Sequence, residues 1–170
     1  TAEYGCDLQD FLTTRKSSIS GILNGIDPSY WNPATDTALA RNFSQGSLSG
    51  KMHNKLALQK EFGLQPDPDI PLLVMITRFD RQKGVDLAIK SFKQIADQNW
   101  QAILLGTGDP ALENACLDFS ASLPKKIKVA LKFDQLLSRR MYGGADFLLM
   151  PSRYEPCGLA QMISMRYGCL

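Results

Sequence analysis

Charged side chains and glycines follow two apolar runs of the chain, where they could bind an anion or a sugar. Arg78 and Lys83 come after the first run, and Glu155 and Gly158 come after the last. A guanidinium binds a diphosphate through a planar fork, and an ammonium binds it as a point charge. A carboxylate can accept hydrogen bonds from sugar hydroxyls or favour a developing positive charge. We therefore predict that these four residues project into one crevice.

Each of these residues also has a purely structural explanation. Arg78 and Lys83 could be solvated charges beside a turn, and Glu155 could be the N-terminal cap of the following helix. What favours a site is that all of them are expected at the same edge of the fold.

That expectation depends on alternating apolar and amphipathic segments from residue 70 onwards. The pattern predicts strands at 72–77, 101–105, 127–133 and 145–150, and helices at 86–96, 111–122, 136–142 and 159–166. Short strands alternating with helices form a parallel sheet covered on both faces, a Rossmann-like α/β architecture. Because ligands of such sheets bind outside the carboxyl ends of the strands, the predicted site residues should meet there.

The sequence before residue 70 predicts fewer regular elements. We expect a short helix at about 8–16, turns over 20–28, an irregular connection over 31–50 and a helix over 51–62. The last helix has apolar residues at helical spacing, namely Met52, Leu56, Leu58 and Phe62. Gly63 is suited to end this helix as a C′ residue.

Composition excludes several classes of function. A net charge of +2 argues against a broad nucleic-acid surface but allows a local phosphate site. The four cysteines show no metal-like spacing, and the single histidine, His53, cannot form a metal cluster by itself. No stretch approaches the roughly 18 apolar residues of a membrane span. We expect reduced thiols, no metal, no membrane partner and, because both ends look cut, a fragment of a longer protein.

A glycine-containing loop and an aromatic residue leave alternatives open. Gly106-Thr107-Gly108-Asp109-Pro110-Ala111 matches the loop of dinucleotide-binding folds. Asp134 would be its ribose partner but lies 28 residues beyond Gly106, against the usual ~20. Close backbone packing therefore explains the glycines better. Phe133 could stack on a base, although the residues alone favour a place in the core.

Three stretches of the chain resemble bacterial glycogen synthases and plant starch synthases. They are residues 21–27 (GILNGID), 77–84 (TRFDRQKG) and 151–159 (PSRYEPCGL). The resemblance implies a retaining glycosyltransferase of the GT-B fold, in which two Rossmann-like domains face each other across a cleft. Residues 1–20 would be the tail of the N-terminal domain or a linker, and 21–170 an incomplete C-terminal domain that binds a nucleotide sugar.

The family implies transfer of glucose from ADP-glucose, or UDP-glucose, to the non-reducing end of an α-1,4-glucan. By this resemblance Arg78 and Lys83 hold the diphosphate as it leaves, and Glu155 contacts the glucosyl unit. Donor-binding positions would be Asn24, the aromatic Phe133 against adenine, and the backbone amides of Cys157, Gly158 and Leu159. The nucleotide sugar is a substrate, and no cofactor is implied.

The chain also departs from the family pattern. The broader superfamily often has a second glutamate eight positions after the first, where this chain has Ile163. The Lys-x-Gly-Gly loop and the active-site histidine of the N-terminal domain are absent, so that missing domain is an expected partner. We predict little or no transfer by this chain alone, and a bacterial cytoplasm or plastid stroma as its compartment. An NAD-binding oxidoreductase domain and a purely glucan-binding module remain the alternatives.

Overall fold

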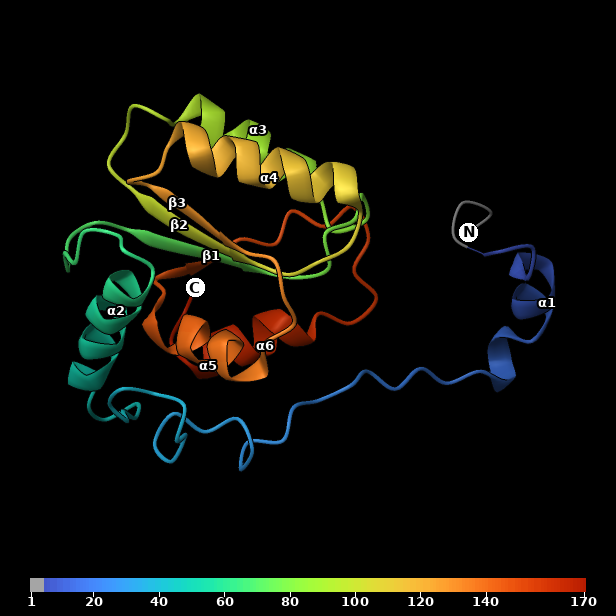
Figure 1. Cartoon of the computed structure of the whole chain (residues 1–170). Coiled ribbons are helices and arrows are strands. Elements are labelled where there is room, and N and C mark those ends of the chain that lie inside the picture. Colours follow the sequence, from blue (N-terminus) through green and yellow to red (C-terminus); the bar gives the residue numbers. More distant parts are fainter. Residues whose placement is uncertain (1–4) are drawn as a thin grey trace.

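The computed structural model describes residues 5–170 and contains a four-stranded sheet with helices on both faces (Figure 1). The strands are all parallel and comprise β1 (Leu72–Ile76), β2 (Gln101–Leu105), β3 (Ile127–Ala130) and β4 (Phe147–Leu148). One face is covered by α3 (Val85–Gln94) and α4 (Pro110–Ser122), and the other by α2 (Ser49–Glu61), α5 (Gln135–Gly144) and α6 (Leu159–Arg166). The predicted Rossmann-like α/β architecture is confirmed.

The strand order is β3-β2-β1-β4, so the chain reverses its direction of winding beside β1. From β1 it proceeds outward through β2 and β3, and it then returns to place β4 on the other side of β1. At such a switch point the two flanking βα loops separate and leave a crevice at the carboxyl ends of the strands. The loops that follow β1 and β4 therefore border the expected ligand site.

Two strands are shorter than the sequence predicts. β4 was expected over 145–150, but only Phe147 and Leu148 are paired as strand residues, opposite Leu73 and Val74 of β1. The flanking backbone still bonds, since Leu149 N–H donates to the Val74 carbonyl at 2.7 Å. β3 was expected to reach residue 133 but ends at Ala130. The chain turns there because the Lys132 N–H bonds back to the Ala130 carbonyl.

Helix α2 presents a mostly polar face to the interior, contrary to the predicted apolar one. Leu58 is buried as expected, but Met52 is exposed. Asn54, Lys55 and Gln59 are buried instead, and each has partners. Lys55 Nζ lies 2.7 Å from a carboxylate oxygen of Asp146, at the start of β4. The periodicity of the sequence therefore predicted the helix but not its buried face.

The connection 31–50 is irregular, as predicted, but it contributes to the core. Asp36 is buried and accepts hydrogen bonds from Arg139 of α5 and from the Tyr167 hydroxyl. Burial raises the pKa of Asp36, but the bonds from Tyr167, the Ala38 amide and Arg139 outweigh it, so the pKa is lowered. The Arg139 guanidinium also lies over the rings of Tyr30 and Trp31. This segment is therefore fastened to α5 by a buried ion pair and to the end of α6 by the hydrogen bond from Tyr167.

The N-terminal segment runs away from the sheet in Figure 1. It contains α1 (Gln9–Thr14), within the predicted helix, and a 3-10 turn (Lys16–Ser18), neither of which has a buried residue. Of the tail predicted over 1–20, residues 1–4 lie outside the described part of the chain. No helix within residues 5–170 has the length and apolar character needed to span a membrane.

Candidate functional site

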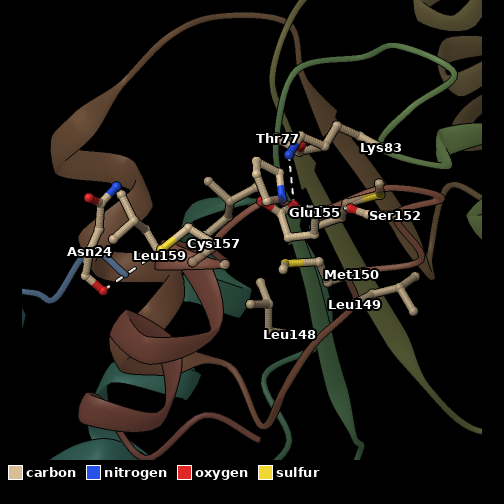
Figure 2. Close-up of a pocket in the computed structure, with 15 residues that line it drawn as sticks. Asn24, Thr77, Lys83, Leu148, Leu149, Met150, Ser152, Glu155, Cys157 and Leu159 are labelled. Carbon is tan, nitrogen blue, oxygen red and sulfur yellow. Dashed lines mark hydrogen bonds and ion pairs between the residues drawn. The ribbon is translucent and has the colours of Figure 1, made fainter. Parts of the chain in front are cut away.

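A cavity of about 340 Å³ opens at the carboxyl ends of β1 and β4. Lys83 and Glu155 lie in its wall, and their side-chain nitrogen and oxygen are 2.7 Å apart (Figure 2). Their side chains are 18% and 23% exposed, so the pair is partly shielded from water. We call this space the ion-pair cavity. It brings a cation and a carboxylate from loops 72 residues apart into direct contact.

The β1–α3 loop holds Lys83 through its backbone. The Lys83 N–H donates to the Asp80 carboxylate at 2.8 Å. Gly84 then begins α3 with φ 72°, in the left-handed region. A Cβ at Gly84 would lie 2.1 Å from the Pro151 carbonyl oxygen, so a larger residue would force the two loops apart. Glycine therefore allows the Lys83 loop to pack against the Glu155 loop.

Glu155 is not the N-terminal cap of α6, which excludes the structural explanation considered above. The cap position is Gly158, which is left-handed and offers no side-chain bond. The Glu155 carboxylate accepts instead from Lys83 and, at 3.3 Å, from the Ser152 hydroxyl. Its orientation therefore depends on contacts made by its own loop and by the loop after β1.

Backbone amides border the same cavity. Within residues 5–170, the N–H groups of Cys157, Gly158 and Leu159 donate to no protein acceptor. These groups precede or begin α6, where N–H groups lack partners inside the helix. Asn24 also lines the cavity, and its carbonyl accepts a weak hydrogen bond from the Cys157 thiol at 3.7 Å (Figure 2). The wall of the cavity thus contains backbone N–H groups without a protein acceptor, close in sequence to Glu155.

A second cavity of about 380 Å³, the Phe133 cavity, adjoins the first, since Ile76 and Thr77 line both. Phe133 lies at its edge and is 93% exposed, so the preference for a core position was wrong. Arg78 lines this cavity, whereas Lys83 and Glu155 line the first. Its side chain is 71% exposed, and its guanidinium pairs with the Asp80 carboxylate at 3.1 Å. The predicted site residues therefore divide between two neighbouring cavities.

The glycine-containing loop serves packing. A Cβ at Gly106 would lie 1.8 Å from the Thr77 carbonyl oxygen, and one at Gly108 would lie 2.3 Å from that of Phe79. The Asp109 carboxylate accepts from the first amides of α4, and the Gly108 N–H donates to Glu113 at 2.7 Å. Side chains of the protein thus occupy donors that a dinucleotide phosphate would need.

Sequence reasoning missed one ion pair, which joins the loop after β4 to the first turn of α3. Arg153 donates from both terminal nitrogens to the two carboxylate oxygens of Asp86, each at 2.8 Å. This bonding lowers the pKa of Asp86 to about 2. The two residues are 67 positions apart, so no local spacing could reveal the pair. Among the described residues, no group of three or more His, Cys, Asp or Glu could hold a metal ion.

Comparison with known proteins identifies the family. Residues 58–170, more than half of the chain, match the family described as glycosyl transferases group 1. The chain belongs to this family. The match includes β1 to β4 and the loops that carry Arg78, Lys83 and Glu155. The family match does not support the alternative of an NAD-binding oxidoreductase domain.

Individual proteins show which members of this family the chain resembles. A glycogen synthase of Streptococcus gordonii is 46% identical over 170 residues, which are all of this chain and 36% of that protein. One of Streptococcus sanguinis is 45% identical over the same length. The catalytic domain of starch synthase IV from Arabidopsis thaliana, solved with ADP and acarbose, covers 100% of this chain with 38% identity and a TM-score of 0.93. The chain spans 36% of the bacterial relatives and 35% of the plant domain.

A glycosyltransferase from Rickettsia africae shares the fold at 17% identity, with a TM-score of 0.65 over 95% of this chain and 41% of its own. Together with the starch synthase structure, it confirms the predicted fold class, a domain of a GT-B glycosyltransferase.

Proposed function

We propose that the chain is the donor-binding part of a glycogen or starch synthase. The whole protein would transfer glucose, with retention, from ADP-glucose or UDP-glucose to the non-reducing end of an α-1,4-glucan. Identity of 46% to a glycogen synthase along the entire chain supports this assignment. So does the similarity to a starch synthase that was solved with ADP and acarbose.

The observation that carries the proposal is the meeting of the two cavities at Thr77. A nucleoside diphosphate sugar has a base, a charged middle and a polar sugar, in that order. The Phe133 ring would stack on the base, and the diphosphate would lie near Thr77 between Arg78 and Lys83. The glucosyl unit would then enter the ion-pair cavity beside Glu155.

The charges in this arrangement suit the breaking of the sugar–phosphate bond. Negative charge grows on the leaving diphosphate, where Arg78 and Lys83 would stabilise it. Positive charge grows at the anomeric carbon, where the Glu155 carboxylate would stabilise it. The free amides of Cys157, Gly158 and Leu159 would hold sugar hydroxyls, and Asn24 would border the donor. No metal or cofactor is needed in this scheme.

The glucan acceptor and the N-terminal domain complete the proposal. Relatives are nearly three times longer than this chain, which leaves room for a domain that closes the cleft. We therefore expect little or no transfer by the isolated chain; sustained incorporation of glucose into glycogen by the pure chain would contradict this. For the compartment, we propose the bacterial cytoplasm or plastid stroma that the family resemblance implies.

Titration calorimetry with ADP, UDP and NADH tests the proposal. We expect ADP or UDP to bind, and the binding to be lost in an Arg78→Ala/Lys83→Ala double variant. Arg81→Ala provides the control, because this exposed cation lies on the same loop but lines neither cavity. NADH binding that survives the double variant, with no binding of ADP or UDP, would overturn the proposal.

A further inference from the structure

We propose that Arg153 and Asp86 form a clasp that positions Lys83 and Glu155 for binding the donor diphosphate. Arg153 is then a positioning residue, because it lines neither cavity and acts through its neighbours. The inference rests on the proposed function for its ligand, a nucleoside diphosphate.

The clasp joins the loop after β4 to the first turn of α3, and further bonds join the same loop to the loop after β1. Beyond its bidentate bond to Asp86, the Arg153 guanidinium donates to the Arg81 carbonyl at 2.6 Å. The Arg153 N–H donates to the Gln82 carbonyl at 2.8 Å. The Gln82 side-chain amide returns a bond to the Tyr154 carbonyl at 3.1 Å. Each loop therefore holds the backbone of the other.

These contacts are made by the sequence neighbours of the ion pair. Gln82 directly precedes Lys83, and Arg153 is two residues before Glu155. The relative position of the two loops thus sets where Lys83 Nζ and the Glu155 carboxylate meet. Because a displacement of about 1 Å at a binding group can cost up to ~10²-fold in rate, small movements of these loops matter.

Solvent exposure argues that the clasp does not serve stability alone. The Arg153 and Asp86 side chains are 35% and 31% exposed, and pairs of this kind contribute little to stability. The planar fork of arginine nevertheless fixes direction, which lysine cannot do. A geometric role therefore fits the pair better than a stabilising one.

Arg153→Gln, Asp86→Asn, their double variant and Arg153→Lys test the clasp. Arg140→Gln is the matched control, because Arg140 makes a similar two-point bond to Glu61, at 3.0 and 3.1 Å, away from both cavities. We expect Arg153→Gln to weaken ADP binding about tenfold or more, with a melting temperature as little changed as in the control. Arg153→Lys should not restore binding, and the double variant should be no worse than either single one.

Unchanged ADP affinity in Arg153→Gln would overturn the clasp. Equal losses of affinity in Arg153→Gln and Arg140→Gln would do the same, since they would indicate general destabilisation. Hydrogen exchange provides a measurement that needs no ligand: the amide of residue 153, which donates to the Gln82 carbonyl, should lose protection in Arg153→Gln and keep it in Arg140→Gln. If the unmodified chain binds neither ADP nor UDP, the proposed function fails, and hydrogen exchange alone decides whether the clasp exists.

Discussion

The two neighbouring cavities differ in how their polar groups are held. In the ion-pair cavity, Lys83 and Glu155 are partly buried, contact each other and stand on loops joined by backbone bonds. In the Phe133 cavity, the aromatic ring is 93% exposed, and the Arg78 side chain, which pairs with Asp80, is 71% exposed. One side of the proposed site is therefore prearranged by packing, and the other offers solvated side chains.

This difference follows from the place of each cavity in the sheet. The ion-pair cavity lies between β1 and β4, where the winding reverses and two βα loops can bond to each other. Charges shielded there interact more strongly than charges in water. The exposed groups of the Phe133 cavity are screened by salt, so they gain strength only when a ligand covers them. We expect substitutions to have unequal effects on the two sides.

The largest effect should come from Gly84→Ala. The left-handed backbone costs about 1–3 kcal/mol for such a residue, and its Cβ would also collide with the Pro151 carbonyl at 2.1 Å. Gly63→Ala is the control, because Gly63 has φ 62° but nothing within 4 Å of the added atom. Thermal unfolding should show a larger decrease in melting temperature for Gly84→Ala than for Gly63→Ala. ADP binding should be reduced in Gly84→Ala alone. Equal losses would mean that the loops can separate without strain.

Lys83→Ala should have the next largest effect. It removes a diphosphate contact and leaves the Glu155 carboxylate partly buried without its cation. We expect calorimetry to find binding of both inorganic pyrophosphate and ADP reduced by ~100-fold, since one charge-assisted hydrogen bond contributes about 1.5–3 kcal/mol. Unchanged pyrophosphate binding would show that the diphosphate does not contact Lys83.

Phe133→Ala should separate the two cavities. Stacking on an aromatic ring is worth about 1–3 kcal/mol per base, so ADP affinity should fall roughly tenfold. Pyrophosphate has no base, and its affinity should not change. Stability should also be unaffected, since the ring is almost fully exposed, and Phe133→Trp should retain ADP binding. A parallel loss of pyrophosphate binding would argue against the proposed order of base and diphosphate.

The smallest expected effect is the loss of thermal stability at low pH when the Asp86 carboxylate of the clasp becomes protonated. The pKa of Asp86 is lowered from 3.8 to about 2 by its bond to Arg153. A carboxyl with a lowered pKa in the folded protein stabilises the fold above its unfolded pKa, and this contribution is lost as pH falls through the folded value. The difference in melting temperature between the unmodified chain and Asp86→Asn should be constant above about pH 5 and shrink toward pH 2. A difference that persists at pH 2 would contradict the assignment.

The sequence predicted the strands and helices better than it predicted which of their side chains are buried. The alternation after residue 70 was sufficient for strand and helix identity, because buried parallel strands are short apolar runs. The polar interior face of α2 escaped prediction, since the partners of the buried Lys55 ammonium, the Asp146 carboxylate and the Pro68 carbonyl, lie outside the helix. The preference for Phe133 in the core failed because a residue after a strand can point either way.

The sequence by itself determined the order of strands and helices, the charged residues after β1 and β4, and the family resemblance. These features are local, since each depends on residue types within a few positions of one another. The tertiary structure decided that Lys83 meets Glu155 while Arg78 lines the neighbouring cavity. It also decided that Arg153 bonds to Asp86. Such pairs depend on strand order and loop direction, which become fixed only when segments about 70 residues apart pack side by side.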